Sequence, residues 1–213
     1  METRCIVLLS GGLDSAVALY WALDQDYDVE TLTFDYFRRS KKEIQACLKI
    51  SKGTNSPNRR IKLQFLKEIV DSKKQLRNPG LSNAESAYIP SRNLIFYGIA
   101  SSFAEISNAK FIVGGHNKND SENFPDSSKN FFDLFNKTGS TGKITKGLTG
   151  NVILPFQKLD KSEVLKLGAR LHVPFELTWS CYRSFERPCE NCLSCRVRAQ
   201  SFQKAGLKDP LLA

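Results

Sequence analysis

The sequence has little that would place the protein in a membrane or outside the cell. None of its apolar runs approaches the roughly 20 residues that a helix needs to cross a bilayer. The N-terminal segment METRCIVLLSGG has no signal-peptide cleavage site, and its apolar run leads directly into a pair of glycines. We therefore expect a cytoplasmic protein without a membrane partner.

Two common nucleotide-binding motifs are missing as well. Without the pattern G-x-x-x-x-G-K-[ST], no lysine follows a glycine-rich loop to reach terminal phosphates. The pattern G-x-G-x-x-G, which marks dinucleotide-binding folds, is also absent. Repeats, low-complexity segments and linkers are lacking, so we predict one domain over residues 1–213.

Positive charge is in excess, with 31 Lys and Arg against 22 Asp and Glu and a net charge of +9. Such a balance favours anionic partners, whether a nucleotide, a nucleic acid or an acidic protein surface. Because the basic residues are scattered, a solvated basic surface is an equally good interpretation.

Strand and helix patterns alternate along the chain. The patterns predict strands at 4–9, 29–36, 60–66, 110–113 and 151–155, and helices at 13–23, 39–52, 92–107, 126–136 and 161–171. Residues 71–90 and 138–150 are polar and turn-rich and predict loops. The alternation indicates an α/β protein with a Rossmann-like, doubly wound and mostly parallel sheet.

The motif Ser10-Gly11-Gly12-Leu13-Asp14-Ser15 stands between the first predicted strand and helix. Its glycines let the backbone approach an anion, and the start of the helix directs free N–H groups and a positive dipole end toward it. Ser10 and Ser15 add hydroxyl donors, while Asp14 can bind Mg²⁺ or order the turn. The motif therefore predicts a phosphate site.

Four of the six cysteines lie close together near the C-terminus with the spacing C-x7-C-x2-C-x2-C. In a chain without a secretion signal this clustering points to metal rather than to disulfides. Four thiolates can surround one Zn²⁺ or hold an iron–sulfur cluster. The candidate ligands are Cys181, Cys189, Cys192 and Cys195.

The glycine motif resembles the pyrophosphate loop of the ATP pyrophosphatases, which cleave ATP between the α and β phosphates and adenylate an oxygen atom. With the cysteine spacing, the resemblance narrows to the 7-cyano-7-deazaguanine synthase family and extends over about residues 5–210. The other similar segments are Phe34-Asp35-Tyr36, Lys41-Lys42-Glu43-Ile44, Pro90-Ser91-Arg92-Asn93, Pro125-Asp126, Leu154-Pro155 and Leu177-Thr178-Trp179-Ser180-Cys181-Tyr182. The resemblance implies an adenine nucleotide α-hydrolase-like fold with a small zinc-binding segment at about residues 177–210.

This resemblance also implies an ATP-dependent carbon–nitrogen ligase of the queuosine and archaeosine pathways. The carboxylate of 7-carboxy-7-deazaguanine would attack the α-phosphorus of ATP and form an acyl adenylate. Ammonia would then give an amide, and a second ATP would activate the amide oxygen before AMP leaves and the nitrile forms. The implied cofactors are ATP, Mg²⁺ and Zn²⁺, and four thiolates around zinc would form a closed structural site.

Roles carry over residue by residue. The pyrophosphate end of ATP is expected at Ser10, Gly11, Gly12, Leu13 and Ser15, with Asp14 near Mg²⁺. Phe34, Asp35 and Tyr36 end the second predicted strand, where adenine or ribose is expected. Arg92 and Asn93 are candidates for phosphate or carboxylate contact, although a solvated charge at a helix end also explains Arg92. Asp14, Ser15 and Arg92 are the expected catalytic residues.

Three other residues have a structural interpretation, and two of them also have a functional one. Trp179 can stack on the purine-like base or belong to the core. His116 follows the fourth predicted strand, where it can act as a general base or be an ordinary loop histidine. His172 is expected to be structural.

Two segments depart from the family pattern. Phe37-Arg38-Arg39-Ser40 stands where the family typically has Gly-Gln-Arg-His, and residues 122–128 replace a Ser-Gly-Tyr-Pro-Asp-Cys-Arg stretch. The second departure leaves open a diverged relative that adenylates a deazaguanine carboxylate but transfers it to another amine on a protein or nucleic acid. A non-catalytic zinc module that binds nucleic acid is a third hypothesis. The sequence also leaves open whether the chain forms a homodimer.

Overall fold

The structure, a computed structural model, describes residues 2–72, 89–142, 149–183 and 185–212. Its centre is a five-stranded sheet in the order β3-β2-β1-β4-β5, and all neighbouring strands are parallel. The strands are β1 (Thr3–Leu8), β2 (Tyr27–Asp35), β3 (Asn58–Lys62), β4 (Phe111–Val113) and β5 (Asn151–Ile153). Because the strands are parallel, their carboxyl ends meet at one edge of the sheet.

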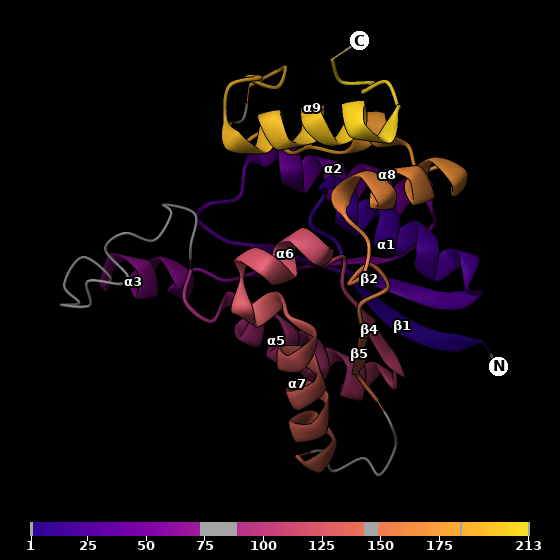
Figure 1. The fold of residues 1–213 in the computed structure, drawn as a ribbon. Helices are drawn as coiled ribbons and strands as arrows, with labels where there is room; N and C mark the ends of the chain where they lie inside the picture. The colour runs from indigo at the N-terminus through magenta and orange to yellow at the C-terminus, as the bar shows by residue number, and fades with distance from the viewer. Residues whose placement is uncertain (1, 73–88, 143–148, 184, 213) are drawn as a thin grey trace.

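Helices cover both faces of this sheet (Figure 1). One face carries α1 (Leu13–Asp24), α2 (Lys41–Gly53), α8 (Lys161–Arg170), the 3₁₀ turn η2 (Phe175–Leu177) and α9 (Leu193–Ala205), and the other carries α3 (Phe65–Ser72), α5 (Arg92–Ser107) and α7 (Lys129–Thr141). Alternation along β1 divides its side chains, since Cys5 and Val7 join the core of the first face and Ile6 that of the second. The predicted doubly wound α/β architecture is confirmed.

Capping residues set the starts of α2 and α8. The side chains of Ser40 and Asp160 each accept a hydrogen bond from a backbone N–H in the first turn, and Glu43 and Glu163 accept one in return from the cap residue. A cap of this kind contributes about 1 kcal/mol to helix stability. The cap at α8 makes Lys161 the first residue of that helix, near the carboxyl edge of the sheet.

Two short helices differ from the sequence prediction. β3 ends at Lys62 rather than at residue 66, and α3 begins at Phe65, because a strand continued to residue 66 would place the buried Leu63 and Leu66 on opposite faces. The second is α6 (Lys118–Asn123), a polar segment for which the sequence predicts no helix, and a capping box at its start stabilises it.

The segment that follows α6 also differs in its boundaries. A 3₁₀ turn, η1 (Pro125–Ser127), precedes α7, which runs to Thr141 and so past the predicted end at residue 136. Of the two predicted loops, residues 73–88 and 143–148 lie outside the described residues.

The C-terminal segment shares the core of the first face. Cys181 and Cys195 belong to the same buried cluster as Leu13 of α1. Arg198 of α9 and Asp209 are both buried and form an ion pair with Nε and Oδ2 2.7 Å apart. Within the described ranges, no helix is both long and apolar enough to cross a bilayer.

Candidate active site

The loop between β1 and α1 forms one wall of the candidate site. Gly11 has a φ of +77°, which favours glycine, and a Cβ there would lie 2.4 Å from the carbonyl oxygen of Glu43. Gly12 is the N-cap of α1 and provides no side chain to bind the first N–H groups of the helix. These N–H groups and the helix dipole therefore suit an anion.

The two serines of the loop bind each other and the loop backbone. Their Oγ atoms lie 2.9 Å apart, and Ser15 Oγ donates to the Gly12 carbonyl at 3.1 Å. The backbone N–H of Ser10 donates to Ser15 Oγ at 3.1 Å, and that of Gly12 donates to Ser10 Oγ at 3.3 Å. The loop thus holds its shape through its own residues, so little rearrangement is needed to receive a phosphate.

A cavity of about 320 Å³ opens beside this loop. Several residues predicted from the sequence line it: Ser10, Gly12, Asp14, Ser15, Tyr36, Arg92, Asn93 and His116. Lining residues that the sequence analysis did not assign include Arg39, Glu43, Phe96, Tyr97, Asp120 and Phe124. The cavity therefore joins the phosphate loop to the start of α5.

Four predicted nucleotide-binding residues do not line this cavity: Gly11 and the three residues Leu13, Phe34 and Asp35. Leu13 and Phe34 are buried in the core, and the Phe34 ring stacks on Phe96 with centroids 4.4 Å apart. The Asp35 carboxylate binds Arg60 of β3. Phe34 therefore supports Phe96 from the core. Direct contact of Leu13, Phe34 and Asp35 with a nucleotide stays a prediction, and the positions of these side chains do not favour it.

Arg92 and Asn93 begin α5 but have different surroundings. The Arg92 guanidinium lies 6.0 Å from the centre of the Phe96 ring, on the cavity wall. The Asn93 amide nitrogen donates to the Asp126 carbonyl at 3.1 Å and to Ser127 Oγ at 3.0 Å. Arg92 is thus the residue that offers charge to a ligand, while Asn93 holds the η1 turn in place.

Asp14 is held by residues from two distant segments. Its Oδ2 lies 2.9 Å from the ammonium of Lys161, and its Oδ1 accepts a hydrogen bond from Asn117 at 3.1 Å. Burial tends to lower the pKa of Lys161, but the charge of Asp14 and its hydrogen bond outweigh burial, so this pKa is raised. The sequence did not predict Lys161 as a site residue. The only signal that distinguishes it from a surface lysine is its position after β5, in the first turn of a helix.

Asp120 is a second carboxylate near Asp14. Burial and the charge of Asp14 raise its pKa, while the backbone N–H of Asn117 and the charge of Lys161 oppose this. The ammonium of Lys161 pairs with Asp14, and its charge also acts on Asp120 at the edge of the cavity. Oxygen ligands of this kind suit Mg²⁺, and one ammonium beside two carboxylates leaves charge for a cation to balance. Asp14 and Asp120 are thus the residues that could hold the metal.

His116 lies between aromatic rings of the opposite wall. Its ring centroid is 5.8 Å from that of Tyr97 and 5.5 Å from that of Phe132. Burial and the charge of Arg92 lower the pKa of His116 to about 4. The imidazole is therefore neutral at physiological pH and adds no charge beside Arg92.

The segment 37–40, where the chain departs from the family pattern, contributes Arg39 to the cavity. This side chain is 7% exposed, binds the Ser10 carbonyl oxygen, and has Nε 3.5 Å from Glu43 Oε2. The sequence named Arg39 only within this departing segment, since its burial depends on α2 folding back onto the loop.

The four cysteines form a second candidate site. Their sulfur atoms all lie within 4.8 Å of one another, and Cys181 and Cys195 are buried. Backbone N–H groups of Cys192 and Asn191 lower the pKa of Cys189 to about 6, which favours the thiolate. The predicted cluster is confirmed, and its four soft ligands fit one tetrahedral metal ion.

Trp179 connects the cysteine loop to the phosphate loop. Its backbone N–H donates to the Gly11 carbonyl and its indole Nε1 to the Cys181 carbonyl, both at 2.8 Å. The side chain is 7% exposed. Of the two interpretations of Trp179, the structure supports the core residue.

Comparisons with known proteins agree with this geometry. The family model described as queuosine biosynthesis protein QueC matches residues 4–206. A protein of Thermoplasma volcanium named 7-cyano-7-deazaguanine synthase is 35% identical over 219 residues, covering 99% of this chain and 91% of that relative. A protein of the same name from Picrophilus torridus is 37% identical over 215 residues, covering 96% of this chain and 89% of that relative.

Solved structures share the fold at lower identity. A 4-thiouridine synthetase, solved with RNA and bound ATP, has a TM-score of 0.58 and 20% identity over 96% of this chain and 50% of its own. NMN synthetase from Francisella tularensis has a TM-score of 0.57 and 19% identity over 97% of this chain and 78% of its own. These similarities show a common architecture.

Proposed function

The chain belongs to the QueC family of queuosine biosynthesis proteins, and on this premise we propose that it converts 7-carboxy-7-deazaguanine and ammonia to 7-cyano-7-deazaguanine with ATP. One observation carries the proposal: the anion-binding loop of residues 10–15 and the Arg92 guanidinium line the same cavity. A nucleotide at the loop and an acid at Arg92 would have the carboxylate oxygen near the α-phosphorus.

The nucleotide end is built by the phosphate loop and two aromatic rings. The N–H groups at the start of α1 and the hydroxyls of Ser10 and Ser15 would bind the β and γ phosphates, which leave as pyrophosphate. Tyr36 and Phe96, with ring centroids 5.6 Å apart, offer an apolar surface for adenine or ribose.

The acid end is built by Arg92 and its neighbours. A guanidinium can donate two parallel hydrogen bonds to one carboxylate, which fixes both its position and its orientation. Because His116 is neutral, the carboxylate meets one cation there rather than two. Phe124 supplies an apolar edge for the bicyclic base.

The reaction then follows from this arrangement. A carboxylate oxygen forms a bond to the α-phosphorus while the bond to the bridging oxygen breaks, and pyrophosphate leaves with that electron pair. Ammonia forms a C–N bond as AMP leaves with the electrons of the C–O bond, and a proton passes to water. The amide oxygen attacks a second ATP in the same way, and loss of AMP and the remaining N–H protons gives the nitrile. Positioning and charge stabilisation supply most of the rate enhancement.

Two metals accompany this proposal. Asp14 and Asp120 would hold Mg²⁺, which supplies charge neutralisation at the phosphate oxygens. Cys181, Cys189, Cys192 and Cys195 would hold Zn²⁺ in a closed, structural shell. Protein purified without air should contain zinc. Iron together with acid-labile sulfide would show instead that the cysteines hold an iron–sulfur cluster.

ATP–pyrophosphate exchange tests the adenylation step directly, because exchange needs the acid but not ammonia. We expect exchange with 7-carboxy-7-deazaguanine and none with unrelated acids, and mass analysis after adding ammonia should show the nitrile. Arg92→Met should reduce exchange, whereas Arg196→Met, at an exposed position of α9, should not. Absence of exchange with this acid would refute the proposal.

A second candidate follows from the altered segment 122–128. This segment contains the end of α6 and all of η1 and brings Phe124 to the cavity, where the family has a different stretch. A diverged enzyme would form the same adenylate but transfer the acyl group to an amine on a protein or nucleic acid. Free nitrile as the sole product, with no adduct on added acceptors, would exclude this candidate.

A further inference from the structure

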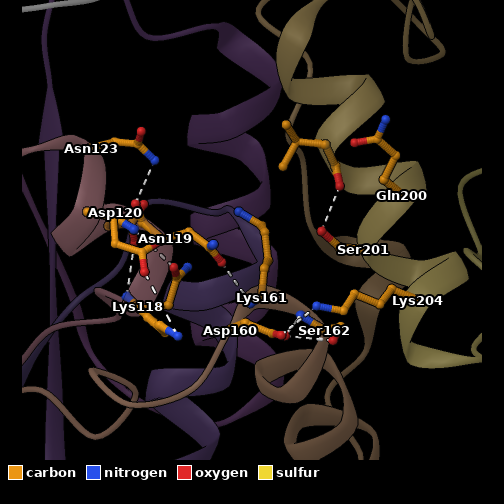
Figure 2. Close-up of a pocket in the computed structure, with 13 residues that line it drawn as sticks. Lys118, Asn119, Asp120, Asn123, Asp160, Lys161, Ser162, Gln200, Ser201 and Lys204 are labelled. Atoms are coloured by element: carbon orange, nitrogen blue, oxygen red, sulfur yellow. Dashed lines mark hydrogen bonds and ion pairs between the residues drawn. The ribbon is translucent and has the colours of Figure 1, made fainter.

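A second cavity, of about 540 Å³, lies on the other side of the Asp14–Lys161 ion pair. It is bordered by α6, the first turn of α8 and one face of α9 and opens to solvent, and Figure 2 shows its lining side chains. The residues that the argument uses are Asn117, Lys118, Asp120, Asp160, Lys161 and Gln200.

The two cavities share a thin wall. Asp14 lines the first cavity and Lys161 the second, with their charged atoms 2.9 Å apart. Asn117 lines the second cavity and donates to Asp14 at 3.1 Å. Asp120 lines both cavities. A molecule in the second cavity is therefore separated from the phosphate loop by one layer of side chains.

The lining limits what this second cavity can take. Its lysines are paired with carboxylates: Lys161 with Asp14, Lys204 with Asp160 at 2.7 Å, and Lys118 with Glu122 at 3.9 Å. Among the described lining residues none is aromatic, so the cavity offers no stacking surface for a base. Carboxylate, amide and hydroxyl groups instead suit a small polar molecule that is neutral or cationic.

The first cavity has little room for a further reactant. At about 320 Å³ it lies at the lower end of the range for a single small-molecule ligand, roughly 300–1,000 Å³. ATP and the acid would together fill it and cover the loop. Ammonia, the third reactant, would then need a separate route to the acyl carbon.

We propose that the second cavity is the route by which ammonia reaches the reaction centre, past the layer formed by Asn117, Asp120 and Lys161. This inference rests on the proposed function, in which ammonia attacks an acyl adenylate. Because the lining lysines are each paired with a carboxylate, their charge does not repel ammonium that enters from water. The ammonium ion gives its proton to water in the second cavity, and the layer then keeps bulk water from the adenylate while ammonia attacks.

Filling the cavity from α9 tests the route. Gln200 is exposed on the cavity side of α9, and Gln203 is exposed on the same helix outside the cavity. Gln200→Trp should lower kcat/KM for ammonium about tenfold or more, equivalent to about 1.4 kcal/mol, and leave ATP–pyrophosphate exchange within about twofold. Gln203→Trp should change neither, and Gln200→Ala should keep the ammonium kcat/KM of the unchanged protein.

Two results would overturn the route while leaving the proposed function intact. One is an equal kcat/KM for ammonium in Gln200→Trp and Gln203→Trp. The other is an equal loss of exchange and of ammonium use in Gln200→Trp, because exchange involves pyrophosphate and no ammonia. Absence of exchange in the unchanged protein would instead refute the adenylation chemistry and the route together.

Discussion

Replacing Arg198 with methionine is expected to remove a large part of the stability of the protein. The Arg198 and Asp209 side chains are only 3% and 5% exposed, and two nitrogens of the guanidinium bind the carboxylate at 2.7 and 2.9 Å. The same guanidinium donates to Thr178 Oγ1 at 2.9 Å and to the Phe175 carbonyl at 3.2 Å. Methionine keeps the aliphatic part of the side chain but leaves the Asp209 carboxylate buried without its cation.

Breaking one side of such a buried pair costs about 3–5 kcal/mol. For a protein of this size each kcal/mol lowers Tm by about 2–4 °C, so a decrease of about 6–20 °C is expected. Urea unfolding followed by tryptophan fluorescence measures the free energy, and a thermal scan measures Tm.

A matched control comes from an exposed pair. Lys129 binds Asp133 with 74% and 58% of the two side chains exposed, so Lys129→Met should leave the unfolding midpoint nearly unchanged. Adding Asp209→Leu to Arg198→Met should recover part of the loss, because the uncompensated charge is then gone. Equal midpoints for Arg198→Met and Lys129→Met would refute the reasoning.

Four other changes have defined outcomes. Asp14→Ala should reduce ATP–pyrophosphate exchange about 100-fold or more, because the carboxylate is expected at the phosphates. The decrease in Tm should be smaller than for Arg198→Met, because the Lys161 and Asp14 side chains are 25% and 20% exposed, so water can solvate the lysine left behind. Lys161→Met should reduce exchange by a similar factor, since it removes the cation that pairs with Asp14, whereas Lys166→Met on the exposed face of α8 should not. Cys192→Ala should lose bound metal and solubility together, as measured by metal analysis and by the fraction of the protein that stays soluble. The pKa of His116 is about 4 in the folded protein and 6.5 in the unfolded chain. The contribution of His116 to the free energy of unfolding is therefore fully present above pH 6.5 and is lost as pH falls through 4, by up to about 3 kcal/mol. Urea unfolding at several pH values should show this slope, and His116→Phe should lack it.

Each of these expectations has a contrary result. An unfolded Asp14→Ala protein would assign that carboxylate to the fold, and full exchange in Lys161→Met would remove the lysine from the site. Soluble, zinc-loaded Cys192→Ala protein would contradict the ligand assignment. The same pH slope in His116→Phe would place the titration on another group.

The order of strands and helices and the phosphate loop could be predicted because each depends on neighbouring residues. The predicted limits of the helix at 92–107 agree with α5, and the turn from β1 to α1 lies where the glycines placed it. The cysteine cluster could be predicted for the same reason, since Cys189, Cys192 and Cys195 are close in sequence, in a turn that leads into the start of α9.

Contacts between distant segments were not predictable in this way. Asp14 meets Asn117 and Lys161 only because parallel strands bring the ends of β1, β4 and β5 to one edge. Local sequence around Lys161 shows a capped helix and nothing of its partner. α6 likewise has no apolar period, and its capping box depends on polar residues that loops also contain.

The hydrogen bond from Trp179 to Gly11 has a consequence for the order in which the protein is made. On the ribosome the loop of residues 10–15 emerges well before Trp179 and the cysteine segment of residues 181–195. Until that segment emerges, the Gly11 carbonyl has no Trp179 to bind, although the strands of the sheet can already pair. The loop proposed to bind ATP thus gains this partner only after the strands have been made, and a chain cut short before Trp179 would have the sheet without that hydrogen bond.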